Sequence, residues 1–140
     1  MIRNIAYLAI VVFIFSGIHA LAADSAREAA ALSAAEKWLA LVDRGKYGES
    51  WEDSAALFKN AVRPGQWTQS MQAVREPLGR LVSRSVKTLA YRTALPGAPD
   101  GEYVVIEFET AFENKKAAVE TVIPMMDPDG VWRVSGYTIK

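Results

Sequence analysis

The chain has no cysteine and a single histidine, His19, in 140 residues. Without cysteine there is no disulfide, so the fold must depend on packing alone even in an oxidising compartment. The same absence excludes thiol nucleophiles and lipid attachment at a signal junction. His19 lies in an expected leader, so the remaining chain also lacks Ser-His triads, histidine bases and the usual zinc and haem ligands. We therefore expect no cofactor, no metal and no catalytic residue of these kinds, and any chemistry falls to Asp, Glu, Tyr, Lys or Arg.

An excess of charge of either sign is also missing. The chain carries 16 basic and 16 acidic residues, and loss of Arg3 with the leader leaves 15 basic against 16 acidic ones. A nearly neutral chain gives no general attraction to nucleic acid or to anionic lipid. We therefore expect no nucleic-acid partner.

Residues 1–22 have the composition of a cleavable export signal. Arg3 precedes an apolar run of about fourteen residues, Ile5–Ile18, whereas a membrane-spanning helix needs about twenty. Ala20 and Ala22 then supply the small side chains of a cleavage site. We expect a signal peptide at 1–22, one domain at 23–140 and a periplasmic or secreted location. The alternative is an uncleaved N-terminal anchor, which would be the only membrane contact.

Periodicity predicts three helices in the first half of the domain. The first begins at Ser25, which forms a capping box with Glu28, and ends at Gly45. A second covers roughly residues 46–59, and a third starts at Pro64, a residue suited to a first helical turn.

From Leu81 onward the period changes to two, which predicts strands. Short turns join them, so we expect an antiparallel four-stranded meander and an α+β class in which the three helices cover one face of a curved sheet. The expected strands are roughly 81–95, 102–113, 116–127 and 131–140.

A two-residue turn at Asn114-Lys115 predicts the register of the second and third strands. It places Ile106 opposite Ile123 on the helix-covered face. On the outer face it places Glu109 opposite Glu120, with Tyr137 beside them. Two adjacent carboxylates can act as an acid-base or cation-binding pair. The alternative is that basic residues of the first strand neutralise them on a solvated face.

Two further features are candidates for a ligand or partner surface. Trp51 and Trp67, with the other two tryptophans, either line a pocket for a small apolar ligand or fill the core. Arg75 either reaches a ligand at the pocket mouth or caps the preceding helix. The outer sheet face, partly apolar, is a candidate surface for a homodimer or an envelope protein.

Four motifs carry a resemblance that covers nearly the whole domain. They are Trp38-Leu-x-Leu-Val-Asp-x-Gly-x-Tyr47-x-x-Ser-Trp51, Arg75-x-Pro77-Leu-Gly79, Leu95-Pro-Gly-x-Pro-Asp-Gly-x-Tyr103 and Trp132-Arg-Val-x-Gly136-Tyr137. With them the chain resembles the bacterial family of exported proteins known as domain of unknown function 4019. The order of elements looks like a nuclear-transport-factor-two-like or cystatin-like roll. The resemblance implies a fold and an exported context, and it implies no activity.

The sequence favours a non-enzymatic exported domain that binds a small molecule or an envelope protein. The motivating observations are the missing histidine and cysteine, the neutral charge and the lack of a catalytic spacing. One alternative is an isomerase or hydratase in a roll pocket, working through Glu109, Glu120 or a tyrosine. A second is a purely structural accessory subunit.

Overall fold

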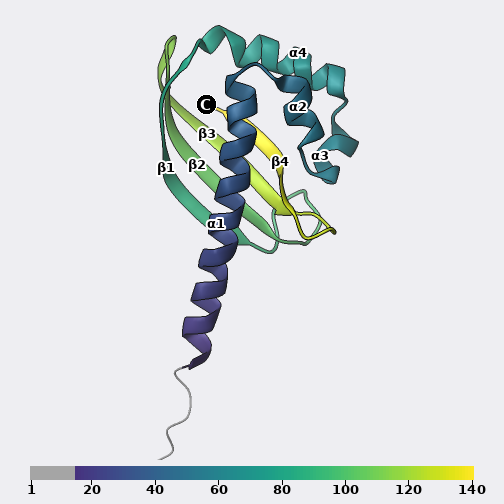
Figure 1. Ribbon diagram of the computed structural model, residues 1–140, viewed down its shortest axis with the longest axis vertical. Coiled ribbons are helices and arrows are strands. Elements are labelled where there is room, and N and C mark those ends of the chain that lie inside the picture. The colour runs from purple at the N-terminus through teal and green to yellow at the C-terminus, as the bar shows by residue number, and fades with distance from the viewer. Residues whose placement is uncertain (1–14) are drawn as a thin grey trace, which may run out of the picture.

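The computed structural model describes residues 15–140, with side chains from residue 21 onward, so most of the expected leader lies outside the described residues. Helices come first and strands second, which confirms the α+β class (Figure 1). The elements are α1 (Phe15–Asp43), α2 (Tyr47–Glu52), α3 (Ala56–Ala61), α4 (Pro64–Val74), the 3-10 helix η1 (Glu76–Leu78), β1 (Leu81–Arg92), β2 (Tyr103–Phe112), β3 (Lys115–Met126) and β4 (Trp132–Ile139).

Helix α1 starts before the expected capping box. It is already helical at Phe15 and continues through Ser25, with alanine, the strongest helix former, at positions 20, 22 and 23. Its end is the expected one: Gly45 has φ 71°, its N–H donates to the Val42 carbonyl, and the Lys46 N–H donates to the Leu41 carbonyl. This pair of bonds is a Schellman motif, which needs the left-handed conformation that glycine adopts without strain.

The expected second helix is two short helices. The chain breaks between α2 and α3, where the Ala55 N–H donates to the Val134 carbonyl of β4 at 2.8 Å. This bond to the sheet replaces a helical bond, which explains why one continuous helix over 46–59 was a wrong expectation. Helix α4 starts at Pro64 as predicted and buries Trp67 and Met71.

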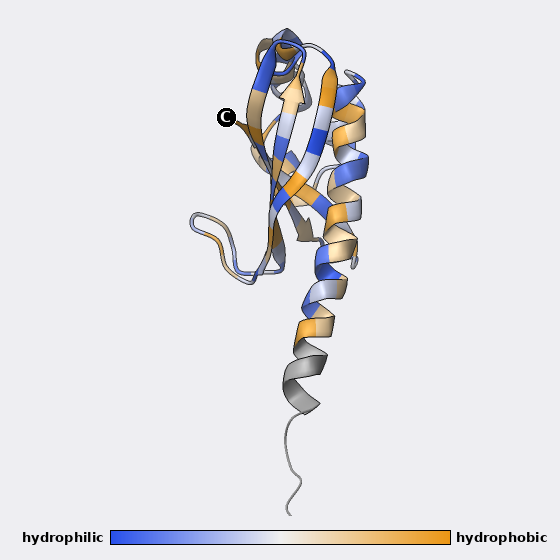
Figure 2. Ribbon diagram, turned by 90° about the vertical axis from the view of Figure 1, so that its left-hand side faces the viewer, coloured by the Kyte–Doolittle hydropathy of each residue, from blue (hydrophilic) through white to orange (hydrophobic). Residues whose placement is uncertain are grey.

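The four strands form one antiparallel sheet in the order β1-β2-β3-β4. Helix α1 crosses all four strands on one face (Figure 1). Turned by 90°, the molecule shows α1 against one side of the sheet, and no described helix lies on the other side (Figure 2). Among the described residues, no helix combines the length and hydropathy that a membrane crossing requires.

The predicted register of β2 and β3 is wrong by one residue. Ile106 lies opposite Val122 rather than Ile123, and Phe108 lies opposite Glu120. The turn is Glu113-Asn114, whose N–H groups donate to the carbonyls of Arg80 and Leu78 just before β1. This turn pairs Phe112 with Lys115, and moving a turn by one residue shifts the partner by two. A register irregularity between Thr110 and Phe112 restores one residue, so the net slip is one. A slip of one residue exchanges the two faces of a strand. Ile123 therefore lies on the outer face, and Glu120 lies under the helices.

The core lies between α1 and the sheet. The predicted apolar faces of α1 and β2 are confirmed, with Trp38, Ile106 and Phe108 at most 3% exposed. The buried cluster consists of Ala31, Ala35, Trp38, Leu39, Val42, Tyr47, Phe58, Trp67, Met71, Val104, Ile106, Phe108, Val122 and Val134.

Candidate functional site

A fully buried carboxylate lies at the centre of the helix-covered face. Glu120 has no exposed surface, and its Oε1 accepts hydrogen bonds from Arg84 Nε and Thr110 Oγ1, both at 2.7 Å. Its Oε2 accepts the hydroxyl proton of Tyr137. Arg84 compensates the charge of Glu120 and the hydroxyl groups complete its hydrogen bonding, as a buried charge requires.

The same network extends to the end of α1. Arg84 Nη1 and Nη2 donate to the two oxygens of Asp43 at 2.8 and 3.0 Å, a bidentate pair. Arg75 Nη2 donates to Asp43 at 3.2 Å. Two arginines and two carboxylates therefore alternate through the interior in the order Glu120, Arg84, Asp43 and Arg75, and their charges cancel.

Arg75 does not lie at a pocket mouth, and the carbonyl that it binds belongs to Gly79, the C-cap residue of η1, rather than to α4. Its side chain is 4% exposed, so it is not at the mouth of a pocket. Its Nη1 donates to the Gly79 carbonyl at 2.6 Å, beyond the end of α4, and its guanidinium lies 4.3 Å from the centre of the Phe112 ring. Arg75 therefore joins η1, β2 and the end of α1.

The environment shifts the pKa values of two groups of this network, Arg84 and Tyr137, and both shifts are upward. Burial lowers the pKa of the Arg84 guanidinium, but hydrogen bonds and charges from Asp43 and Glu120 raise it more, so the net shift is upward. Burial, together with the charge and hydrogen bond of Glu120, raises the pKa of Tyr137 far above its ordinary value. Arg84 stays charged and Tyr137 stays neutral near neutral pH, so neither is poised to exchange a proton there.

The predicted carboxylate pair does not form. Glu109 lies opposite Val119 on the outer face and is exposed, whereas Glu120 lies on the covered face. The alternative, neutralisation by the first strand, is correct for Glu120 through Arg84, although this pair lies in the interior rather than on a solvated face.

The interior tryptophans form core rather than a pocket. Trp67 lies 5.8 Å from Trp38 and 5.1 Å from Phe58, measured between ring centres, and Tyr137 lies 5.1 Å from Trp38. The indole N–H groups are satisfied: Trp67 donates to Ser50 Oγ, and Trp38 donates to the Ser50 carbonyl. Trp51 is half-buried and donates to the Val62 carbonyl at 2.7 Å.

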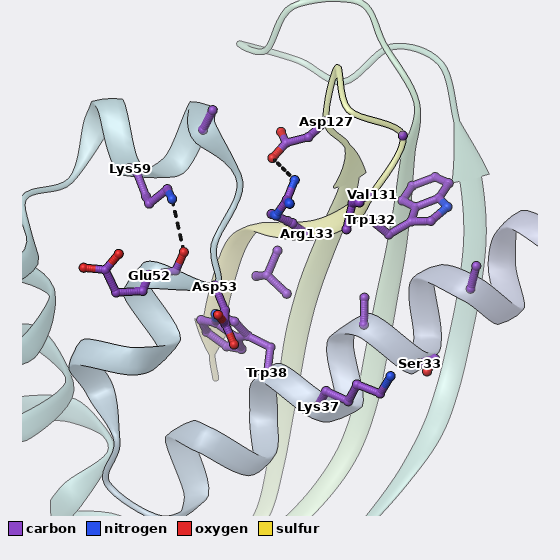
Figure 3. Close-up of a pocket in the computed structure, with 15 residues that line it drawn as sticks. Ser33, Lys37, Trp38, Glu52, Asp53, Lys59, Asp127, Val131, Trp132 and Arg133 are labelled. Carbon is purple, nitrogen blue, oxygen red and sulfur yellow. Dashed lines mark hydrogen bonds and ion pairs between the residues drawn. The ribbon is translucent and has the colours of Figure 1, made fainter.

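An open groove of about 750 Å³ lies outside this core, between α1, the segment from α2 to α3, and the turn between β3 and β4 (Figure 3). Its lining residues are Ala30, Ser33, Ala34, Lys37, Trp38, Glu52, Asp53, Ala56, Lys59, Asp127, Gly130, Val131, Trp132, Arg133 and Val134. We call this feature the α1–β4 groove.

Small side chains of α1 leave the space for this groove. Ser33 and Ala34 lie three and four residues after Ala30, so both share a helix face with it. Across the groove stand Val131, which is 46% exposed, and Trp132, which is half-buried. The apolar wall of the groove is therefore an indole and an aliphatic side chain facing a helix of small residues.

Charges of both signs lie around the groove. Among residues 21–140, no ion pair or side-chain hydrogen bond engages Lys37, Glu52 or Asp53 through its charged group. Arg133, by contrast, is paired with Asp127 at 3.0 Å and with Asp129 at 2.8 Å. Figure 3 shows Lys37 on α1 and Asp53 on the opposite wall, at separate places along the groove.

Sequence reasoning missed this groove, although one signal was present. The small residues of α1 can be read from the sequence. The groove beside them, however, depends on the position of the β3–β4 turn, which no local sequence pattern reveals. Within the described part of the chain, no cluster of three or more potential metal-ligating acidic or histidine side chains is present.

Comparisons with known proteins agree with the motifs. No curated protein and no solved structure matches this chain. The model of one family matches residues 34–137, which covers α2 to α4, the whole sheet except its last residues, and the part of α1 that carries Trp38 and Asp43. The chain therefore belongs to the family described as protein of unknown function (DUF4019).

Proposed function

We propose that this protein is a non-catalytic binding domain and that the α1–β4 groove holds its ligand. The observation that carries the proposal is an open groove whose Lys37, Glu52 and Asp53 have no charged partner among the described residues. In the interior formed by residues 21–140, by contrast, the aromatic residues pack together and Asp43 and Glu120 are paired with Arg84.

The groove favours a small molecule that has an apolar body and charged ends of opposite sign. Its volume lies within the range of about 300–1,000 Å³ that is usual for small-molecule sites. Trp132 and Val131 give the apolar body a surface, while Lys37 attracts an anionic end and Asp53 a cationic end. The sequence predicted a small apolar ligand, and the charged residues of the groove lead us to propose a ligand that also carries charges.

A defined dipeptide tests this proposal. Leucyl-leucine with free ends carries both charges, and its N-acetylated, C-amidated form carries neither. When the free dipeptide is added to the protein, the NMR signal of the Trp132 indole should shift. The blocked dipeptide should bind at least about tenfold more weakly, because it lacks both charges. Ala34→Trp fills the groove and should abolish the shift, whereas Ala29→Trp, an exposed change on α1 outside the groove, should keep it.

Two outcomes would count against the groove. If the free dipeptide leaves the signals of Lys37, Asp53 and Trp132 unchanged at millimolar concentration, a dipolar ligand is wrong. If binding occurs and survives Ala34→Trp, the ligand lies elsewhere.

We also propose that the domain is exported after cleavage behind Ala22 and that it is a nuclear-transport-factor-two-like or cystatin-like roll. The Arg3, apolar run and Ala20-x-Ala22 pattern supports export. A long helix crossing one face of an antiparallel meander supports the roll. An intact mass that starts at Ala23 in protein from the cell envelope would support cleavage, and a mass that includes Met1 would contradict it.

The isomerase or hydratase alternative has no supporting observation. It requires a desolvated carboxylate that is open to a substrate, but Glu120 is enclosed and accepts bonds from Arg84, Thr110 and Tyr137. Glu109 is open but solvated.

A further inference from the structure

The side of the sheet away from α1 carries a regular arrangement of side chains, which we call the outer face. It is defined here by two rows of three residues, Glu109, Val119 and Lys140 in the first and Val105, Ile123 and Gly136 in the second. Each row has its central residue on β3 and its flanking residues on β2 and at β4. No described helix covers this face (Figure 2).

The first row places opposite charges symmetrically about an apolar residue. Glu109 lies opposite Val119, and Val119 exchanges two backbone hydrogen bonds of 2.9 Å with Lys140 on its other side. Because neighbouring strands lie about 4.8 Å apart, Glu109 and Lys140 are roughly equidistant from Val119. Neither charged side chain forms an ion pair within residues 21–140.

The second row is also complementary about its central residue, but here the flanking side chains differ in size rather than in charge. Ile123 lies opposite Gly136, and a Cβ placed on Gly136 would lie 3.7 Å from Ile123 Cδ1, so both positions share the outer face. The register of β2 and β3 puts Val105 on the other flank. Ile123 is therefore flanked by a valine on one side and, on the other, by a glycine, which has no side chain.

We propose that the outer face binds a second copy of this chain, with the two-fold axis parallel to β3. Such a rotation exchanges the β2 and β4 sides of the sheet. It places Glu109 of each copy over Lys140 of the other and Val105 over Gly136, while Val119 and Ile123 each meet their own equivalent. Charge pairs with charge and a side chain meets a gap, which is the self-complementarity that a two-fold interface requires.

Two other features fit this partner. Val105, Val119 and Ile123 are all half-buried in the single chain, so a partner would complete their burial. A hollow of about 560 Å³ lies beside Glu109 and Lys140, lined also by Ser83, Ser85 and Lys116. The hollow gives the long side chains of the second copy room to enter.

A charge exchange tests the interface by sedimentation equilibrium on the exported protein. Glu109→Lys or Lys140→Glu alone creates two like-charge contacts by symmetry and should weaken the dimer about tenfold. The double variant restores both pairs and should recover the affinity of the unaltered protein. Glu36→Lys, an exposed reversal on α1, is the matched control and should change nothing.

Gly136→Leu provides a second route to the same question, because it fills the gap that Val105 of the partner would occupy. Circular dichroism should show an intact fold, and the dimer should weaken. The proposal is overturned if the unaltered protein is monomeric at about 1 mM, or if the double charge exchange is no better than the single reversals. None of these variants touches the α1–β4 groove, so the result is independent of dipeptide binding.

Discussion

Glu109 and Glu120 lie on adjacent strands but on opposite faces of the sheet, the first exposed and the second without exposed surface. Glu120→Gln should lower the free energy of unfolding by roughly 3 kcal/mol, because it removes one charge of a buried pair and leaves Arg84 undercompensated. Glu109→Gln should change it by less than about 0.5 kcal/mol. Urea unfolding of the two variants measures the difference, and equal losses would contradict the assigned faces.

Tyr137 should make stability fall in alkali. Its folded pKa is raised by burial and by Glu120, whereas its pKa in the unfolded chain is about 10. Its contribution is therefore fully present below pH 10 and is lost above it, because the unfolded chain then releases a proton that the folded chain retains. The loss attributable to this group should be about 1.4 kcal/mol per pH unit.

Tyr137→Phe isolates this contribution. Near pH 8 the variant should be less stable by about 1 kcal/mol, since Glu120 loses a hydrogen bond. Between pH 10 and 11 the gap should shrink and reverse, because phenylalanine does not titrate. Urea unfolding across this range measures the gap, and a constant gap would show that the folded pKa of Tyr137 is not raised.

Ser50→Ala should cost about 2 kcal/mol of unfolding free energy. Ser50 is fully buried; its Oγ accepts the Trp67 indole proton and donates to the Tyr47 carbonyl. Removing the hydroxyl leaves a buried indole N–H without a partner. Ser70→Ala, an exposed change on α4, is the control for thermal unfolding and should be nearly neutral. A neutral Ser50→Ala would mean that water replaces the lost bonds.

Gly79 should tolerate substitution less well than Gly97. Both have a positive φ, 77° and 76°, so alanine is strained at each. A Cβ on Gly79 would also lie 3.0 Å from Glu113 Cβ, whereas nothing lies within 4 Å of a Cβ on Gly97. Gly79→Ala should therefore be the more destabilising by at least about 1 kcal/mol in chemical unfolding. Equal losses in the two variants would show that backbone strain alone accounts for the destabilisation at each position.

The parts of the fold that depend on local patterns were predictable. Capping residues predict the end of α1 at Gly45 and the start of α4 at Pro64. Turn residues and the hydrophobic period of two predict the four strands and their meander order. The break between α2 and α3 was not, because it depends on a bond from Ala55 to β4, 79 residues further along the chain.

The face of β3 could not be chosen correctly from its own residues. The set containing Val119, Ile123 and Met125 is more apolar than the set containing Glu120, so patterning favours the wrong face. The observed register is stabilised by Arg84, which compensates Glu120, and by the carbonyls that hold the Glu113-Asn114 turn. Both partners come from distant segments.

The candidate site was the least predictable feature. Of the six residues considered, Arg75, Glu120 and Tyr137 do converge, but in a closed network. Trp67 belongs to the core, Trp51 lies beside it, and Glu109 lies on the outer face.

The contact between Trp38 and Tyr137 has a consequence for the order of folding. Helix α1 can form locally, but Tyr137, which packs against the Trp38 indole, comes from β4, the last strand in chain order. Neighbouring strands can join as successive hairpins at little entropic cost, whereas closing the chain between α1 and β4 requires a loop of about a hundred residues. We therefore expect the sheet to assemble by short-range steps and the hydrophobic interior to close last, in a single slow event.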